Sequence, residues 1–232
     1  MQQKLALIHT SQVFITVETM MKDLFREIMP DVALINIVDD SLLPTVMREQ
    51  RISPAVTRRV CFYVEAAEVA GADAVLSLCS SLGPAIDVAR TITEMPVIKI
   101  DDAHTQKAVQ DADRIGVMAT VATTLFPTVE LIKQKAADAA KQVEIHHSLS
   151  DSAFEALIGG DKKRHDEMVI EAAAALAPKV DVILFAQASM TRLAPRVHDL
   201  TGLPVLTSPR LAIEGTKRIL DGLREPSPVG AG

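Results

Sequence analysis

The sequence has little of what several classes of protein require. It contains no Trp and a single Tyr, so it lacks the aromatic side chains on which proteins stack single-stranded nucleic acid. Its two cysteines, Cys61 and Cys79, are 18 positions apart, which fits neither a disulfide framework nor a zinc motif. No apolar run approaches the roughly 18 residues of a membrane span. Residues 1–9 turn polar too early for a signal peptide. We therefore expect a cytoplasmic protein that has no contact with a membrane.

Charge and motif content exclude further classes. The formal net charge is -6 at pH 7, and the largest basic cluster, residues 162–164, is followed directly by acidic residues, so no nucleic-acid partner is expected. Neither GxGxxG nor GxxxxGK[ST] occurs, so the signatures of dinucleotide and nucleotide phosphate sites are missing. His146 and His147 have no third ligand nearby in the sequence, which argues against a metal site. The sequence thus predicts neither a cofactor nor a metal.

What is present is a chain suited to a large core. It has 232 residues, of which 48% are hydrophobic and 23% charged, a balance typical of a globular protein. Short, continuous apolar runs alternate with helical patterns, as expected for parallel strands covered on both faces. The expected strands are 4–9, 32–38, 73–79, 96–100, 114–119, 142–147, 181–187 and 204–207. The expected helices are 13–29, 53–70, 84–93, 104–112, 124–140, 161–177, 190–199 and 209–223.

An internal repeat organises these elements. The segment from Asp73 through Cys79 and on to residue 84 recurs 108 positions later, from Asp181 through Gln187 to residue 192, and the strands that follow keep the same offset. The sequence therefore predicts an α/β fold made of two pseudo-symmetric βαβ halves, each a four-stranded, mostly parallel sheet flanked by helices. We place the halves at 1–102 and 103–224, and expect a flexible tail at 225–232.

Polar residues cluster where the strands are expected to end. In open α/β sheets, ligands bind beyond the carboxyl ends of the strands. Hydroxyl groups there, together with N–H groups at the starts of helices, suit a small carboxylate. The residues that we predict to bind such a substrate are Thr10, Ser80, Ser81, Thr120, Thr123, Thr124, Gln187 and Ser189. Taken singly, each Ser or Thr also fits an ordinary helix cap.

Two motifs at these strand ends resemble those of the aspartate/glutamate racemase superfamily, which includes hydantoin racemases, maleate isomerases and arylmalonate decarboxylases. Cys79-Ser80-Ser81 is similar to the family's Cys-Asn-Thr, and Ala186-Gln-Ala-Ser-Met190 stands where members carry Gly-Cys-Thr or Gly-Cys-Ala-Gly-Met. The resemblance covers nearly the whole chain. It implies the two-half α/β fold, catalysis without a cofactor, and a homodimer or higher homo-oligomer.

The sequence departs from the family's pattern at one catalytic position. A racemase of this family uses two thiols on opposite faces of the substrate α-carbon, and Gln187 occupies the second place. An amide neither takes nor gives a proton at neutral pH, so the two-thiol mechanism does not carry over.

Cys79 is the predicted catalyst. It follows a strand and precedes a helix that Pro84 helps to start. Nearby N–H groups and the positive helix end are expected to lower the pKa of such a thiol from its usual value of about 8.5. A buried, packing role is the alternative. Cys61, in contrast, lies within a helical pattern and is predicted to pack in the core.

Several other polar residues have two interpretations each. His9 ends the first strand and is either a second catalytic acid or a structural group. Lys99 and Asp101 end the fourth strand, as an ion pair or as part of the pocket. Arg210 is either a carboxylate clamp or a surface residue.

The function that these observations predict is proton transfer by Cys79 at the carbon next to a carboxylate, as in a racemase or isomerase acting on an amino acid, a hydantoin or a similar small acid. If the reaction is a racemisation, His9 or Asp101 must serve the second face. Two alternatives stay open: a one-thiol decarboxylase or lyase acting on a malonate-type acid, and a non-catalytic protein that binds small carboxylates.

Overall fold

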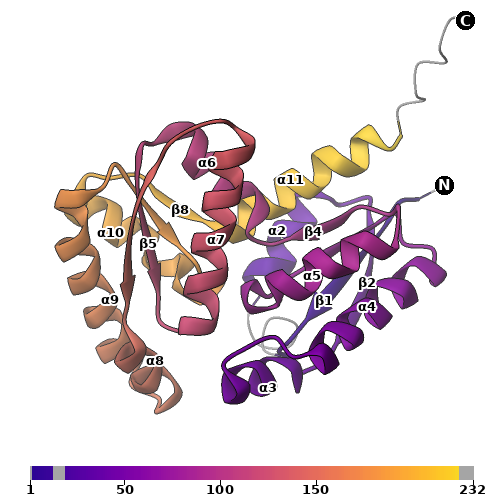
Figure 1. The fold of residues 1–232 in the computed structure, drawn as a ribbon, viewed down its shortest axis with the longest axis horizontal. Coiled ribbons are helices and arrows are strands. Elements are labelled where there is room, and N and C mark those ends of the chain that lie inside the picture. The colour runs from indigo at the N-terminus through magenta and orange to yellow at the C-terminus, as the bar shows by residue number, and fades with distance from the viewer. Residues whose placement is uncertain (1, 13–18, 225–232) are drawn as a thin grey trace, which may run out of the picture. The chain divides into compact units, whose positions relative to one another are not determined.

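The structure is a computed structural model that describes residues 2–12 and 19–224. Its internal contacts divide the chain into two compact units. The first holds the described residues up to Ile100 together with those from Ala212 onward, and the second holds 101–211. Each unit is built around one parallel sheet (Figure 1). The last described helix, α11 (Ser208–Gly222), therefore begins in the second unit and contributes most of its residues to the first, whereas the repeat alone predicts halves of 1–102 and 103–224.

The first sheet has the strand order β2-β1-β3-β4, and all its pairs are parallel. Its strands are β1 (Lys4–His9), β2 (Ala33–Val38), β3 (Ala74–Ser77) and β4 (Val97–Lys99). The helices of this part of the chain are α2 (Met20–Ile28), α3 (Leu42–Glu49), α4 (Pro54–Val69), α5 (Gly83–Ala89) and the short 3₁₀ helices η1 (Ser80–Leu82) and η2 (Arg90–Ile92).

The second sheet repeats this order as β6-β5-β7-β8, again all parallel. Its strands are β5 (Arg114–Ala119), β6 (Glu144–Leu149), β7 (Val182–Phe185) and β8 (Val205–Thr207). The helices of this part are α6 (Asp102–Asp111), α7 (Ala122–Asp138), α8 (Asp151–Ile158), α9 (Lys162–Leu176), α10 (Ala194–Thr201) and the 3₁₀ helices η3 (Ala177–Lys179) and η4 (Ala188–Leu193). The predicted α/β architecture of two four-stranded parallel sheets is confirmed.

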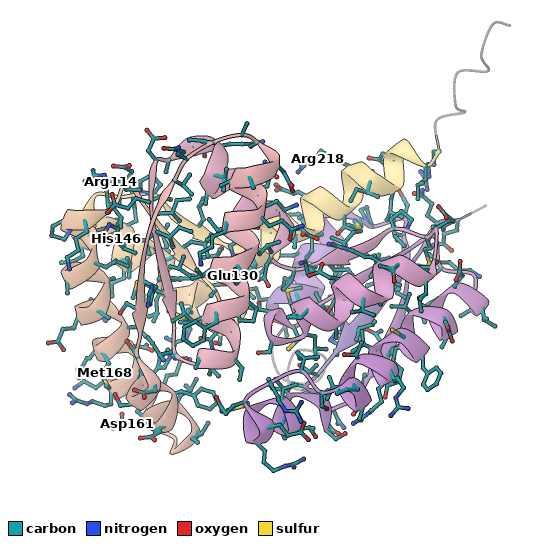
Figure 2. The ribbon with its side chains drawn as sticks, in the orientation of Figure 1. Arg114, Glu130, His146, Asp161, Met168 and Arg218 are labelled. Carbon is teal, nitrogen blue, oxygen red and sulfur yellow. The ribbon has the colours of Figure 1, made fainter. Side chains whose placement is uncertain are left out.

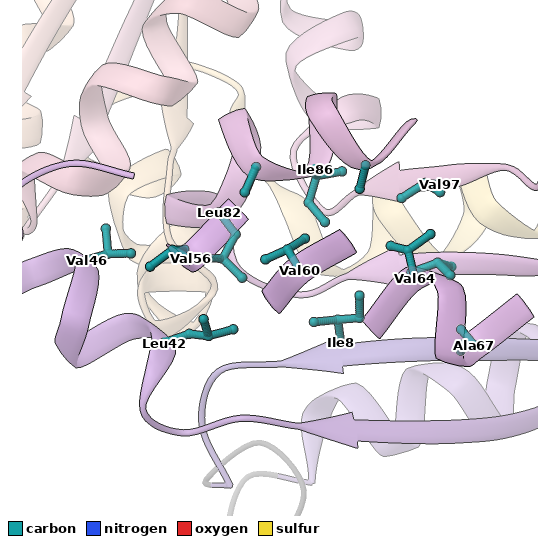
Figure 3. Close-up of a cluster of buried hydrophobic side chains, with 14 residues drawn as sticks. Ile8, Leu42, Val46, Val56, Val60, Val64, Ala67, Leu82, Ile86 and Val97 are labelled. Atoms are coloured by element: carbon teal, nitrogen blue, oxygen red, sulfur yellow. The ribbon is translucent and has the colours of Figure 1, made fainter. Parts of the chain in front are cut away.

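Apolar side chains from α4 and the strands form the core on one face of the first sheet. Val56, Val60 and Val64 are spaced four residues apart, which places them on one stripe of α4. They are at most 1% exposed and pack with Ile8 of β1 and Leu82 of η1 (Figure 3). The helix begins where the sequence predicts, because Ser53 caps it and Pro54 fits its first turn. This packing fixes η1, and with it the turn that follows β3.

The second unit has a core on each face of its sheet. Ile115, Val117 and Leu184 belong to one cluster, whereas Met118 and Phe185 point to the other, as the alternation of side chains along a strand requires. The second cluster packs under α9 and also receives Met190 and Leu193 from η4. Both central strands are therefore buried on both faces, which explains their continuous apolar sequence.

Hydrogen bonds at matching positions confirm that the two halves are copies of one pattern. The Asp73 carboxylate accepts the Lys4 N–H at 2.7 Å, and the Asp181 carboxylate accepts the Arg114 N–H at 2.9 Å. Figure 2 labels Arg114 at the start of β5. The same aspartates donate their own N–H groups to the Lys4 and Arg114 carbonyls, both at 2.8 Å.

Some elements differ from those predicted. Helices α3 and α8 replace segments expected to be loops, and β6 lies two residues later than predicted at its start. The helix predicted at 84–93 is divided into α5 and η2. Part of the helix predicted at 13–29 (residues 13–18) and the predicted tail at 225–232 lie outside the described residues. Within the described ranges, no helix is both long and apolar enough to cross a bilayer.

Candidate functional site

Cys79 stands at the carboxyl end of the first sheet, two residues beyond β3. Its backbone is extended (φ -134°, ψ 111°), and its carbonyl accepts the Leu82 N–H at 3.1 Å, which closes the η1 turn. The residue is partly buried and packs against the core cluster of α4. The preceding residue is tied to the centre of the sheet, because the Leu78 N–H donates to the Ile8 carbonyl at 3.0 Å. The fold thus holds the thiol at a strand end, as the sequence predicts.

The predicted hydroxyls of the first half lie around the same edge. Ser80 and Ser81 form η1 directly after the thiol, with Ser81 only 2% exposed. Thr10 follows β1, the neighbour of β3 in the sheet, and is 8% exposed. These three residues share with Cys79 the edge at which parallel α/β sheets bind ligands.

His9 is buried at the end of β1 and bonds to the neighbouring strand. Its Nε2 lies 2.9 Å from Asn36 Oδ1 on β2. Burial lowers the pKa of His9, and the Asn36 contact opposes that shift. Side chains alternate along β1, and Ile8 points into the α4 core, so His9 projects from the opposite face of the sheet. Because burial lowers its pKa, the imidazole is neutral at neutral pH, and the contact with Asn36 holds it in place.

A carboxylate network follows β2 at the same edge. Asp39 accepts hydrogen bonds from Arg59, from the Tyr63 hydroxyl and from the Ser41 N–H, the last at 3.1 Å. Although its partial burial raises the pKa of Asp39, these hydrogen bonds hold that pKa below its ordinary value. The Asp39 N–H donates to the His9 carbonyl at 3.0 Å. The network therefore fixes the turn after β2 to α4 and to the end of β1.

The charged residues near the ends of β4 and β8 differ in their surroundings. Lys99 is buried and forms an ion pair with Asp87 of α5, with Nζ 2.8 Å from the carboxylate. Asp101 is 2% exposed at the start of α6. Arg210 lies on α11 with an exposed side chain. Lys99 thus forms an ion pair with Asp87, which was not predicted.

In the second half, Gln187 occupies the turn that corresponds to Cys79. Its backbone is also extended (φ -131°, ψ 133°), and its carbonyl accepts the Met190 N–H at 3.1 Å, which starts η4. Its side-chain Oε1 accepts the Thr120 N–H at 2.6 Å and lies 3.2 Å from the Thr120 hydroxyl oxygen. The structure thus brings together two of the predicted site residues and joins the ends of β5 and β7 through them.

The remaining predicted residues of this half lie on the helices that follow. Thr123 and Thr124 are in the first turn of α7, with Thr124 6% exposed, and Ser189 is half-buried in η4. Arg192 of η4 forms an ion pair with Asp166 of α9.

A histidine extends that ion pair into the core. His165 is fully buried, and its Nδ1 lies 2.8 Å from Asp166 Oδ1. The hydrogen bonds from Arg192 and His165 lower the pKa of Asp166. This cluster anchors η4 to α9, which begins at its Asp161 cap (Figure 2).

Asn36 and the networks of Asp39 and Asp166 were not predicted from the sequence. Asp39 carried a usable signal, because it directly follows a strand. Asn36 and Asp166 carried none, since each lies inside a strand or helix and its partner is 27 or 26 positions away. Within the described part of the chain, no group of three or more His, Cys, Asp or Glu side chains is arranged to hold a metal ion.

Comparison with known proteins assigns a family model to this chain. The model of Asp/Glu/hydantoin racemases matches residues 15–216. A search of curated protein sequences finds no match.

Solved structures with the same fold include two racemases and a decarboxylase. Glutamate racemase isoform RacE1 from Bacillus anthracis is 15% identical, with a TM-score of 0.72 over 96% of this chain and 83% of that one. Allantoin racemase from Klebsiella pneumoniae is 18% identical, with a TM-score of 0.65 over 98% and 91%. A cysteine-substituted mutant of arylmalonate decarboxylase is 19% identical, with a TM-score of 0.61 over 99% and 97%.

Proposed function

The chain belongs to the Asp/Glu/hydantoin racemase family, and on that basis we propose that it is a cofactor-independent enzyme in which Cys79 transfers a proton at the carbon next to a substrate carboxylate. The observation that carries the proposal is the position of Cys79. It is a thiol in an extended residue at the carboxyl end of a central strand, followed by a serine-lined turn. Catalytic groups of parallel α/β proteins occupy that position.

The proposed step needs only groups that the chain supplies. A Cys79 thiolate takes the proton from the α-carbon, the electron pair of the C–H bond moves into the carboxylate, and an enediolate forms. A proton is then returned to the carbon. Hydroxyls at the strand ends, among them Ser80, Ser81 and Thr10, are the proposed donors to the oxygen atoms on which negative charge develops.

The second half supports one-thiol chemistry. Gln187 stands in the turn that corresponds to Cys79, and its amide does not act as an acid or a base at neutral pH. For a racemisation, the proposal therefore requires a second acid, for which His9 is the candidate from the sequence. His9 bonds to Asn36 on the face of the sheet opposite the α4 core, whereas Cys79 packs against that core. This position does not favour His9 as the second acid.

This observation favours a decarboxylase as the second candidate. In that reaction the C–C bond to a malonate carboxylate breaks, carbon dioxide leaves, and the electron pair remains on the carbon, which takes the Cys79 proton. One thiol suffices. The substrate class in both cases is a small carboxylic acid, and a cytoplasmic location and a homo-oligomeric state remain predictions from the sequence and the family.

A substrate screen tests the proposal. Purified protein is incubated with glutamate, aspartate, allantoin, other hydantoins and aryl- and alkylmalonates. Exchange and consumption are followed by NMR, and inversion is followed by chiral chromatography. The screen is repeated with Cys79→Ser and with the control Cys61→Ser, which alters a thiol on α4. We expect one of these compounds to react with the wild type and the control, and turnover by Cys79→Ser to fall by at least about a thousandfold.

Two results would overturn the proposal. Turnover by Cys79→Ser close to that of the wild type would remove Cys79 from the chemistry. Binding of a small carboxylate without any exchange or turnover would identify a non-catalytic binding protein instead.

A further inference from the structure

The contact between Gln187 and Thr120 occupies two hydrogen-bond donors at a strand end. The Gln187 side-chain oxygen lies 2.6 Å from the Thr120 backbone nitrogen and 3.2 Å from the Thr120 hydroxyl. Thr120 comes directly after β5 and directly before Val121, the cap of the 17-residue helix α7. A backbone N–H and a hydroxyl at such a position form a donor pair suited to one oxygen of a carboxylate.

The group that fills this donor pair belongs to the chain itself. An amide oxygen is a planar, neutral acceptor and resembles one oxygen of a carboxylate in shape. We propose that Gln187 is a gate: its side chain occupies the donor pair of Thr120 in the closed state, and a small carboxylate binds to this pair after the side chain has rotated away. The ligand class rests on the proposed function, whereas the gate rests on the contacts of Gln187.

The surroundings restrict the opening movement to the side chain. The Gln187 carbonyl accepts the Met190 N–H at 3.1 Å, and Met190 and Leu193 are buried under α9. Arg192 is paired with Asp166. The backbone on the carboxyl side of Gln187 is thus held at three points. Gln187 itself is only half-buried, so its side chain has solvent to rotate into on the fast timescale of rotamer exchange.

Burial at Thr120 agrees with a closed gate. Thr120 is 1% exposed, although it lies at the end of a strand. A carboxylate accepts stronger hydrogen bonds than a neutral amide does, because the bonds are assisted by its charge. A carboxylate ligand therefore displaces the Gln187 oxygen, and the apparent affinity is reduced by the fraction of molecules in which the gate is open.

The first half carries a different side chain at the corresponding position. Cys79 occupies the same turn, with the same 3.1 Å hydrogen bond from its carbonyl to the residue three positions later. Sulfur is a weak acceptor and the cysteine side chain is shorter than that of glutamine. The gate is therefore a property of the half that carries glutamine.

Calorimetric titration with malonate tests the gate. All proteins carry Cys79→Ala, so that no turnover disturbs the binding signal. We expect Gln187→Ala to bind malonate more tightly than the parent, by about tenfold if the gate is open in roughly a tenth of the molecules. Gln187→Glu places a carboxylate on the donors permanently and should abolish binding. Gln142→Ala, which changes an exposed glutamine of the same unit, should bind as the parent does.

A second variant separates the hydrogen bond from folding. Gln187→Met keeps the bulk of the side chain and removes the acceptor, so it should also bind more tightly, even if Gln187→Ala fails to fold. Equal or weaker binding by a folded Gln187→Met, or no binding by any variant, would overturn the gate.

The result of the malonate titration can be separated from the test of the proposed function. Loss of the gate effect in a protein whose wild type turns substrate over would leave the proposed function intact. A clear gate effect in a protein that never turns substrate over would reject only the proposed function.

Discussion

The two cysteines differ in ways that a labelling experiment can measure. Cys61 lies within α4 and packs against the core, and both its burial and the nearby carboxylate of Glu65 raise its pKa. Cys79 lies beyond a strand end, in a turn. Because the thiolate is the reactive form, we predict that iodoacetamide at neutral pH labels Cys79 well before Cys61. Peptide mapping by mass spectrometry gives the order. Earlier labelling of Cys61, or a Cys79 that reacts only after denaturation, would contradict the assignment of Cys79.

A second titratable residue, His104, links folding to pH. It is fully buried on α6, and neither of its ring nitrogens makes a well-formed hydrogen bond. Burial lowers the pKa of His104 to about 4, although the carbonyls of Asp101 and Phe185 and the carboxylate of Asp102 favour the charged form. The folded protein therefore holds a neutral imidazole at a pH where the unfolded chain already binds a proton.

The sign of the pH effect follows from this difference. Above the unfolded pKa of about 6.5 both states are neutral at His104, and the residue adds no pH dependence. As the pH falls from 6.5 to 4, only the unfolded state gains the proton, so stability is lost. The loss attributable to His104 is about 3 kcal/mol over this interval, taking 1.36 kcal/mol per pKa unit.

Denaturant unfolding between pH 4 and 7 measures that loss. We expect His104→Gln to have a flatter dependence of the unfolding free energy on pH than the wild type has. His147→Gln, which changes an exposed histidine, should leave the dependence unchanged. Parallel curves for the wild type and His104→Gln would show that His104 does not titrate on unfolding.

At the scale of secondary structure, the sequence predicts the strands better than the short helices. The buried runs of β1, β3, β5 and β7 are continuous and apolar, and each is found within two residues of its predicted limits. Helix α3 was not predicted. Pro44 weakens its helical pattern in the sequence, although in the structure this proline lies within the first turn of the helix, where proline is tolerated. Helix α8 has eight residues and only one buried side chain, Ala153, so its pattern is weak.

In the candidate site, too, features that depend on neighbouring residues were predicted, and contacts between residues far apart in the sequence were not. Cys79 could be identified because a strand ending in a polar turn is visible in the sequence. The bond between Gln187 and Thr120 joins residues 67 positions apart, and its existence depends on the neighbouring positions of β5 and β7 in the sheet. Arg59 of α4 likewise pairs with Asp39, 20 positions away, across a turn and a helix that the sequence does not bring together.

The ion pair of Arg192 and Asp166 should contribute measurably to the anchoring of η4. Its side chains are 35% and 19% exposed, and His165 supports the carboxylate. Since the pair is partly desolvated, we predict a coupling energy of about 1–2 kcal/mol in a double-mutant cycle of Arg192→Ala and Asp166→Ala. The exposed pair Lys133–Glu130 of α7 is the matched control, with an expected coupling of at most about 0.5 kcal/mol. Equal coupling in the two cycles would mean that the Arg192 pair does not anchor η4.

Over the whole molecule, the two halves share their backbone pattern and differ in the side chain at the corresponding turn. Strands β3 and β4 are related to β7 and β8 by 108 positions, and the backbone hydrogen bonds at Asp73 recur at Asp181. The turns at Cys79 and Gln187 retain the same backbone form. Their side chains differ, so one half carries a group that can transfer a proton and the other carries one that cannot.

Solvent isotope incorporation tests this asymmetry, and with it the role of Cys79, most directly. The substrate found in the screen is incubated in deuterium oxide with the wild type and with Cys79→Ser. The product is analysed by NMR for deuterium at the α-carbon and by chiral chromatography for its configuration. A single thiol reaches one face of a planar carbanion, so the account predicts one deuterium, one configuration, and no incorporation by Cys79→Ser. Incorporation at the wild-type rate by Cys79→Ser would contradict the role of Cys79. A racemic product from the wild type would contradict the one-thiol asymmetry, because it requires a second acid on the opposite face.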